Sequence, residues 1–389
     1  MSKARERIEK RRARQHAVNR RLSTVDQTKP PQTGTITKVG TQITERISAL
    51  GSVPRNRLLL LIPAVGVVLL VIAALGVLKP EDDSALGNAY WLTRAWTYQP
   101  QDEASINDLV NRLKEHRIDQ LYIYLSSLKT DGTWAGEPGL RDRYSEVEPN
   151  VNAFIEQLDA AYPEADLYGW IEVVATTPSG YRLSDPQLHT TVAEFSGRAM
   201  RSLGIDGVLL DVKPVFTDND DLTVLLRAIR AEIGLDNILA VVAAPDLTPS
   251  DAGITVAEQI APDTMWSTEY KQRIALQADR MIVTAYNSYL TDPVDYINWV
   301  THQVQAYTEA LTLIDGGAQV LISIPSYADM TPAHASDIES IAAALDGVNH
   351  AIPQMTDSEI AKLQGVAIYS DDPLSNAEWQ AYDQRWPRD

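Results

Sequence analysis

Residues 204–214 read Gly204-Ile205-Asp206-Gly207-Val208-Leu209-Leu210-Asp211-Val212-Lys213-Pro214. A short, β-branched apolar run that begins at a glycine and ends at a proline is typical of one buried β-strand. Side chains of a strand alternate between its two faces, so Asp211 and Lys213 are expected to point the same way. Two opposite charges at the end of an apolar strand are costly to bury unless they are paired or used. They indicate either a structural ion pair or a ligand-facing site.

The chain around this run alternates between apolar strands and helices. From Asn88 onward we find eight such units and no second domain boundary. This pattern predicts an α/β fold, a (β/α)8 TIM barrel, over residues 88–389. An open doubly wound sheet is the alternative, but no strand is followed by the Gly-rich turn that binds phosphate in such folds. The expected strands are the quoted run and Tyr90–Trp96, Gln120–Leu125, Asp166–Val174, Ile238–Ala244, Arg280–Tyr286, Gln319–Ile324 and Gly365–Tyr369.

The N-terminal part of the chain differs from the rest in charge. Met1–Arg57 carries 14 basic and 4 acidic residues, whereas the remainder carries 20 basic and 48 acidic ones. Between the two charged parts, Leu58–Leu78 is 21 residues long and uncharged. A helix of that length spans roughly 30 Å of hydrocarbon. A cleaved signal peptide is the alternative, but the basic region before the run is too long for one. We therefore expect a single transmembrane helix over residues 58–78.

The charge difference also predicts topology. Basic residues favour the cytoplasmic side of a membrane, so residues 1–57 are expected to form a cytoplasmic tail and linker. Residues 79–87 would then be a short linker, and the barrel would lie outside the cell membrane. Met1–Leu22 reads either as a polybasic patch for anionic lipid or as a solvated tail that only sets topology. Nucleic acid is an unexpected partner, because no aromatic residue for base stacking precedes Tyr90.

In such a barrel, ligands meet the carboxyl ends of the strands and the loops that follow them. Aromatic and acidic side chains gather at those ends. This mixture suits sugars, whose ring faces stack on aromatic rings while carboxylates and amides bind the hydroxyl groups. Packing at the barrel mouth is the alternative explanation. The candidate site residues at these ends are Trp96, Tyr124, Glu172, Asp211, Lys213, Tyr286, Asn287, Tyr327 and Tyr369.

Residues 206–213 resemble the signature strand of the family 18 glycoside hydrolases, the chitinase-type barrels, whose pattern is Asp-Gly-x-Asp-x-Asp-x-Glu. Asp206, Gly207 and Asp211 match this pattern. Leu209 replaces its middle acid, and Lys213 stands where the family carries its catalytic Glu. Three further stretches resemble the family's sixth, seventh and eighth strands in the correct order, namely Met281–Asn287, Ile324–Tyr327 and Gly365–Tyr369.

The resemblance implies substrate-assisted hydrolysis, in which a Glu protonates the leaving oxygen and an Asp orients the substrate's acetamido group. Asp211 would keep the orienting role, and Tyr286 would hydrogen-bond the acetamido group. Asp206 and Asn287 would belong to the substrate-binding residues. Lys213 would not replace the acid, because an ammonium with a pKa of about 10 is a poor proton donor at neutral pH.

We therefore expect a membrane-anchored barrel that binds envelope or cell-surface glycans with weak or no hydrolysis. Two alternatives stay open: an active glycosidase that uses Glu172 and Asp211, and a non-enzymatic envelope assembly or protein-binding module. No cofactor is expected. The six His residues are scattered without ligand spacing, which argues against a His metal site, and the lack of Cys excludes thiolate chemistry.

Overall fold

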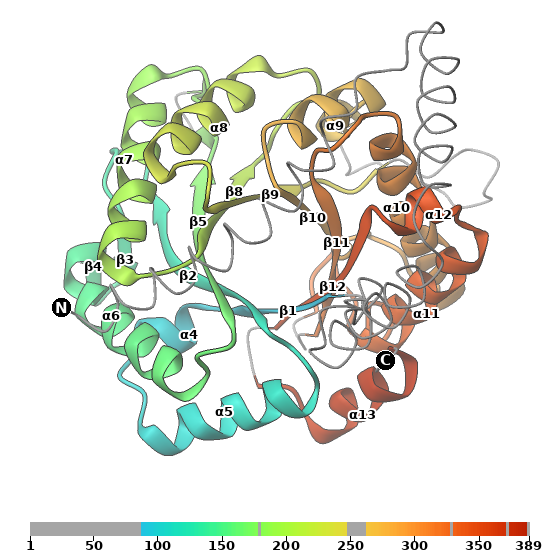
Figure 1. Ribbon diagram of the computed structural model, residues 1–389, viewed down its shortest axis with the longest axis horizontal. Helices are drawn as coiled ribbons and strands as arrows, with labels where there is room; N and C mark the ends of the chain where they lie inside the picture. The colour runs from blue at the N-terminus through green and yellow to red at the C-terminus, as the bar shows by residue number, and fades with distance from the viewer. Residues whose placement is uncertain (1–86, 178–179, 247–261, 327–329, 371–372, 387–389) are drawn as a thin grey trace, which may run out of the picture. The chain divides into compact units, whose positions relative to one another are not determined.

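A computed structural model describes residues 87–177, 180–246, 262–326, 330–370 and 373–386. Eight parallel strands close into a barrel in the order β1-β12-β11-β10-β9-β8-β5-β2, and helices surround it (Figure 1). The predicted (β/α)8 barrel is thereby confirmed. The barrel strands are β1 (Gly87–Leu92), β2 (Gln120–Leu128), β5 (Asp166–Val174), β8 (Gly207–Lys213), β9 (Ile238–Ala243), β10 (Arg280–Thr284), β11 (Gln319–Pro325) and β12 (Leu363–Tyr369).

Local signals mark both ends of helix α7 (Pro186–Leu203). Asp185 caps α7 by accepting a hydrogen bond from the Gln187 backbone N–H, with Pro186 at the first helical position. Gly204 ends α7 at φ 68°, a left-handed conformation that glycine adopts without a steric penalty. The helices are α4 (Arg94–Thr97), α5 (Glu103–Glu115), α6 (Tyr144–Ala161), α7 (Pro186–Leu203), α8 (Asp220–Ile233), α9 (Thr268–Ala275), α10 (Pro293–Thr312), α11 (Ile341–Ala351), α12 (Asp357–Ile360) and α13 (Asn376–Arg385), with 3-10 turns at Pro262–Thr264 and Ile352–Gln354.

Strand β8 is buried along almost its whole length. Its residues from Gly207 to Val212 are all buried, and Lys213 is the exposed one at its end. β8 pairs with β5 on one side and β9 on the other, and the register places Glu172 of β5 directly beside Asp211. The run quoted at the outset is therefore a central strand that delivers its two charges to one end of the barrel.

Two parts of the predicted pattern differ from the structure. β1 ends at Leu92, so the expected strand Tyr90–Trp96 extends too far. Its last residues form the short helix α4, because the Trp96 ring packs against Phe154 of α6 (centroids 6.2 Å apart). The segment between β2 and α6, in which the sequence predicted no strand, contains the hairpin β3 (Ala135–Glu137) and β4 (Arg141–Arg143).

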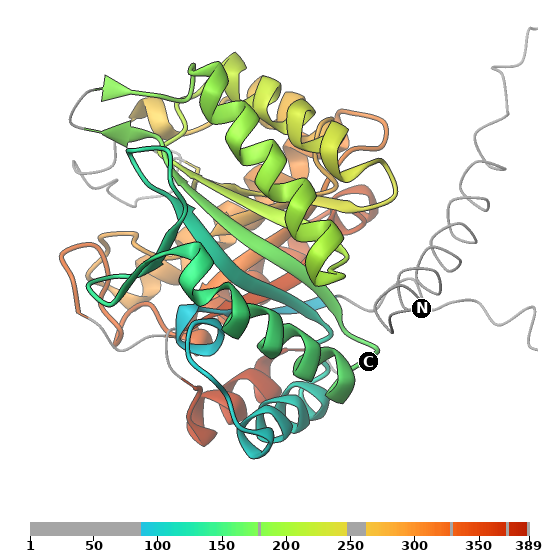
Figure 2. The ribbon, with the colours of Figure 1, turned by 90° about the vertical axis from the view of Figure 1, so that its left-hand side faces the viewer.

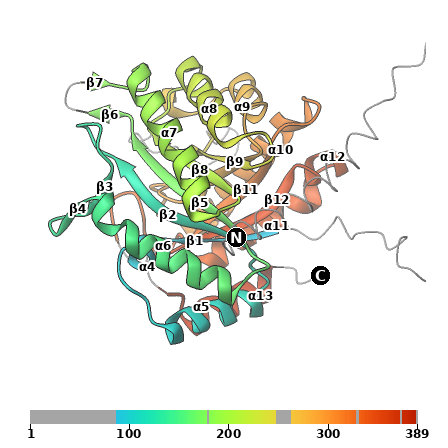
Figure 3. The same cartoon turned by 60° about the vertical axis from the view of Figure 1, so that its left-hand side comes forward.

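A second hairpin, β6 (Thr176–Thr177) and β7 (Gly180–Tyr181), follows β5. Figures 2 and 3 show both hairpins on the side of the barrel where the strands end.

Within the described residues, no helix combines the length and apolar character needed to cross a membrane. The expected span Leu58–Leu78 and the basic tail lie outside that part of the chain.

Candidate functional site

An open cavity of about 420 Å³ lies at the carboxyl ends of the barrel strands, and we call it the mouth. Its volume falls within the range of about 300–1,000 Å³ that is usual for ligand sites. Seven of the predicted site residues line it: Tyr124, Glu172, Asp211, Lys213, Tyr286, Asn287 and Tyr369. The strand ends thus bring together side chains that lie far apart in the sequence.

Asp211 and Lys213 lie on the same face of β8, as strand alternation predicts, and they form an ion pair. Lys213 Nζ donates to Asp211 Oδ2 at 2.9 Å. The carboxylate is buried (1% exposed), whereas the lysine side chain is 54% exposed because it stands in the open mouth. Partial burial among protein atoms disfavours the ammonium ion, but the charges of Asp211 and Glu172 outweigh this and raise the pKa of Lys213. The lysine therefore keeps its proton at neutral pH.

The second oxygen of Asp211 has no partner in this arrangement. Oδ1 is buried, and no group in the described part of the chain hydrogen-bonds to it. A buried carboxylate oxygen without a partner is costly, so a donor supplied by a ligand would stabilise it. The ion pair consequently uses one oxygen of the carboxylate, and the other has no donor among the described residues.

Glu172 lies next to this pair on the neighbouring strand. Burial and the nearby Asp211 raise its pKa, against the opposing effect of Lys213. The Tyr124 hydroxyl donates a long hydrogen bond of 3.5 Å to Glu172 Oε2. Lys213 donates its hydrogen bond to Asp211 rather than to Glu172. A carboxyl group with a raised pKa beside an ionised one is the arrangement that acid catalysis uses.

Aromatic rings form the wall of the mouth. Trp170 of β5 meets Tyr124 edge-on at 4.8 Å, and Tyr286 stacks on Tyr369 at 5.3 Å. Trp91 of β1 lies 4.8 Å from Trp170 and extends this wall into the barrel. Such clusters present flat apolar faces beside polar groups, which suits the two chemical sides of a sugar ring.

The sequence-based prediction did not include every residue of the mouth. Trp170, Thr93, Arg94 and Thr331 also line it. Trp170 was detectable, because it precedes Glu172 by two residues and therefore lies on the same face of β5. Thr93 and Arg94 lie at the start of α4, and Thr331 lies in the loop after β11. The positions of these segments depend on packing, and no local signal places them in the mouth.

Three predicted site residues are not among those that line the mouth. Trp96 packs on Phe154, outside the barrel. Asp206 precedes β8 and so lies at the opposite end of the barrel, where its carboxylate accepts the Leu167 backbone N–H at 2.7 Å. It is a link between β8 and β5 at that end. Tyr327 falls outside the described residues.

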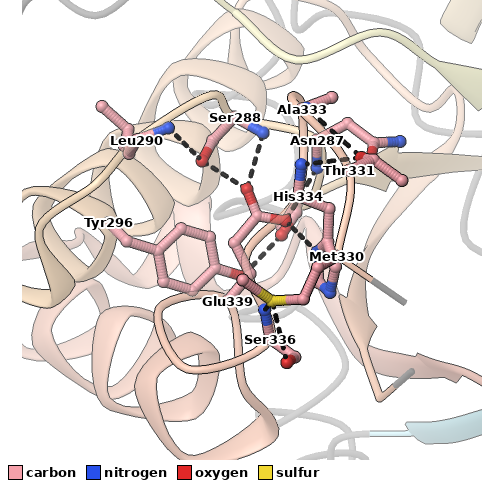
Figure 4. A network of polar contacts seen from close by, with 11 residues as sticks. Asn287, Ser288, Leu290, Tyr296, Met330, Thr331, Ala333, His334, Ser336 and Glu339 are labelled. Atoms are coloured by element: carbon pink, nitrogen blue, oxygen red, sulfur yellow. Dashed lines mark hydrogen bonds and ion pairs between the residues drawn. The ribbon is translucent and has the colours of Figure 1, made fainter. Parts of the chain in front are cut away.

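The buried carboxylate of Glu339 holds in place the loop that carries Asn287 at the mouth (Figure 4). Glu339 accepts the backbone N–H of Asn287 at 2.9 Å and that of Ser288 at 2.7 Å, the Ser288 hydroxyl at 2.5 Å, and a contact of 2.6 Å from His334 Nδ1. Asn287 has φ 59°, a conformation that is uncommon outside glycine. The hydrogen bonds of Glu339 thus fix the backbone at Asn287, whose side chain lines the mouth. Through its contact with Glu339, His334 links the loop of Asn287 to the loop that carries Thr331.

The part of the chain that the structure describes holds no cluster of three or more His, Asp or Glu residues suited to a metal ion. The side chains that line the mouth supply one lysine, one arginine, two carboxylates, hydroxyl and amide groups and aromatic rings.

Solved structures with a similar fold include chitinase-type barrels. A class V chitinase from Pseudomonas fluorescens Pf-5 matches with a TM-score of 0.50 and 12% identity, over 78% of this chain and 100% of that chain. A spore cortex-lytic enzyme from Bacillus cereus matches with a TM-score of 0.48 and 9% identity, over 78% of this chain and 75% of that chain. A glycoside hydrolase family 18 N-acetylglucosaminidase from Paenibacillus barengoltzii matches with a TM-score of 0.47 and 12% identity, over 77% and 99%.

Comparisons of the sequence alone give no match. No protein-family model matches this chain, and no curated protein is significantly similar to it. The closed barrel of eight parallel strands itself establishes the fold. At such low identities, similarity to solved structures extends to the fold alone, and any function has to be argued from the mouth itself.

Proposed function

We propose that this protein binds glycans in the mouth of its barrel and hydrolyses them weakly or not at all. The observation that carries the proposal is the combination of the aromatic wall with the half-satisfied carboxylate of Asp211. The rings offer stacking surfaces, and Asp211 Oδ1 needs a donor that a sugar hydroxyl or acetamido N–H would supply. The expected ligand is a glycan with N-acetylated sugars, such as an envelope polysaccharide.

Weak hydrolysis follows from the group at position 213. An acid catalyst must give up its proton as the bond to the leaving oxygen breaks. Asp211 and Glu172 stabilise the charged form of Lys213 and make this release harder. The lysine still donates a hydrogen bond, so it contributes to holding a ligand without completing the reaction.

The binding test uses the full chain and a matched pair of aspartate variants. Titration calorimetry with chito-oligosaccharides and peptidoglycan fragments should give saturable binding by the wild type. Asp211→Asn should weaken it about tenfold, because the half-satisfied carboxylate is lost. Asp206→Asn, which changes the same residue type at the opposite end of the barrel, should bind like the wild type. Absence of binding to any glycan on an array would refute the proposal.

An active glycosidase is the second candidate, and the register of β5 and β8 favours it. Glu172 and Asp211 are directly paired positions on neighbouring strands, and the pKa of Glu172 is raised. In this mechanism Glu172 would act as the general acid, with Asp211 as the second carboxylate. Turnover of an aryl glycoside that disappears in Glu172→Gln, while Glu359→Gln stays active, would select this function.

We further propose that the barrel is anchored outside the cell membrane by residues 58–78. The uncharged run and the basic excess before it support this arrangement. Protease added to intact cells should digest the chain after Lys79 and leave residues 1–57 protected. Recovery of a soluble protein cleaved near Ala74 would refute the anchor.

A further inference from the structure

Four large aliphatic side chains are exposed at the end of the barrel where the strands begin. Leu235, Leu276 and Leu313 follow α8, α9 and α10, and Ile360 ends α12. Their exposed fractions are 86%, 56%, 69% and 36% in that order. Single exposed leucines are ordinary on protein surfaces, but a group on one face marks an interaction site. We call these four residues the apolar rim.

The four loops of the apolar rim are neighbours in space. They lead into β9, β10, β11 and β12, which follow one another around the barrel, at about 4.8 Å from strand to strand. The Ala318 backbone N–H donates to the Ala275 carbonyl at 2.9 Å, which joins the loops after α9 and α10. Lys362 Nζ donates to the Gly316 carbonyl at 2.6 Å, which joins the loops after α10 and α12. The loops that carry the apolar rim are therefore neighbours around this end of the barrel.

The loops that lead into β2 and β5, on the other side of the same end, carry exposed charged residues instead of exposed aliphatic ones. Arg117 follows α5 and Glu164 follows α6, and both are exposed charged residues. The aliphatic side chains are thus confined to one half of this end, next to the place where the chain enters the barrel. Gly87 opens β1 and pairs with Gly365 of β12, only a few residues beyond Ile360.

The length of chain before Gly87 limits how far this end lies from the proposed anchor. Eight residues, 79–86, separate Gly87 from the uncharged run Leu58–Leu78. Even a fully extended chain covers only about 3.5 Å per residue, so the connection reaches at most about 30 Å. In a barrel anchored in this way, the start of β1 stays within about 30 Å of the end of the uncharged run.

We propose that the apolar rim rests in the headgroup region of the bilayer that holds the chain. The inference rests on the proposed anchor. Aliphatic side chains gain free energy in this region, but four of them bind a domain weakly, so the contact depends on the short tether. Asp236 and Asp315 beside the rim offer no attraction to anionic lipid, so the aliphatic groups provide the contact. The mouth, at the opposite end, would then face away from the membrane toward envelope glycans.

Because the chain contains no cysteine, single thiols report one position at a time. The full chain would be reconstituted in phosphatidylcholine nanodiscs with an environment-sensitive fluorophore on Leu235→Cys or Leu313→Cys. Lipids that carry a doxyl quencher should lower this fluorescence about twofold. Labels on Leu140→Cys in the β3–β4 turn and Val224→Cys on α8, both exposed in the structure, should be unaffected. Glycan binding by each labelled variant checks that the barrel is folded.

The outcomes separate this inference from the anchor. If the chain enters nanodiscs but the rim labels are quenched no more than the controls, the membrane contact is refuted while the anchor stands. If the chain does not enter nanodiscs, both are refuted. Rim labels that are shielded equally in detergent, without quenching by doxyl lipid, would assign the rim to a second copy of this chain or to another protein and would also overturn the proposal.

Discussion

The two ends of the barrel both hold charges against aromatic rings, but only one of them is open. At the end where the strands begin, the Arg280 guanidinium lies 4.6 Å over the ring of Tyr168, whose hydroxyl donates to Asp166 at 3.1 Å. Tyr122 packs on Tyr168 at 5.6 Å, and both rings are buried. We call these four residues the base cluster. At the other end, the ion pair of Asp211 and Lys213 borders a cavity of about 420 Å³.

The base cluster and the mouth show how charged groups beside aromatic rings behave in a closed and in an open environment. In the base cluster, burial disfavours the charged guanidinium, but the oxygens of Tyr168, Tyr122 and Asp166 outweigh this and raise the pKa of Arg280. Its interactions are therefore directed inward. Both ends hold buried polar atoms without a hydrogen-bond partner among the described residues: Asp211 Oδ1 in the mouth, and the Tyr122 hydroxyl and one terminal nitrogen of Arg280 in the base cluster. The two ends differ in access, because only the mouth opens onto a cavity. We infer that the base cluster serves stability and that the mouth is the end available to a ligand.

The largest effect is expected from removing the charge of the base cluster. Arg280→Met should lower the free energy of unfolding by about 3–5 kcal/mol, because it leaves Asp166 and two buried tyrosine hydroxyls without the guanidinium. Urea unfolding of the full chain in nanodiscs measures this change. The affinity of the remaining folded protein for glycans should be unchanged. A large loss of affinity with little loss of stability would reverse the assignment of the two ends.

A smaller loss of stability is expected from a substitution in the mouth. Lys213→Ala should lower the free energy of unfolding by about 1–2 kcal/mol, since it leaves the buried Asp211 carboxylate unpaired while the lysine itself is half exposed. The pKa of Lys213 is raised above its ordinary value of 10.5. The stabilisation by the ion pair is therefore present below pH 10.5 and is lost as the pH rises through the folded-state pKa.

Paired melting curves of wild type and Lys213→Ala between pH 7 and pH 11.5 check this dependence, because their difference removes other titrating groups. The difference should shrink above pH 10.5. Hydrolysis of β-linked N-acetylglucosamine oligomers should stay at background in both proteins. Brisk wild-type turnover that Lys213→Ala abolishes would make the lysine catalytic and contradict this account.

Removing the hydrogen bond that links β8 and β5 where these strands begin should lower the stability modestly. Asp206→Ala removes the acceptor of the Leu167 backbone N–H and should cost about 1 kcal/mol of stability. Glycan affinity measured by calorimetry should match the wild type. A tenfold loss of affinity would mean that Asp206 acts on the mouth across the barrel.

Glu172→Gln is expected to give the smallest change in stability, with the opposite sign. The raised pKa of Glu172 means that the folded state holds this proton more tightly than the unfolded state, whose ordinary value is 4.5. Stability contributed by this group therefore falls as the pH rises from 4.5 through the folded-state pKa. The glutamine variant should melt slightly above wild type at pH 7, with a gain that vanishes near pH 4. A lower melting temperature at pH 7 would show that the ionised Glu172 is stabilising, through Lys213.

Several elements of this protein could be read from local sequence. The bounds of β5 agree with the predicted range Asp166–Val174, because apolar runs act within a few residues. The shared face of Asp211 and Lys213 follows from strand alternation alone. Asp206 was assigned to the site through a family pattern, although its place before the strand already put it at the opposite end.

Tertiary structure decided the features that depend on distant residues. Trp96 left the predicted strand because Phe154, 58 positions later, offered its ring a packing partner. Whether Lys213 pairs with Asp211 or Glu172 depended on the geometry of two strands, and the place of Asn287 depended on Glu339 in another loop. By itself, then, the sequence determined the strands, the helices and the residues at their ends, because those signals are local. The closed barrel decided which of these residues meet, because burial, pairing and charge coupling act through space.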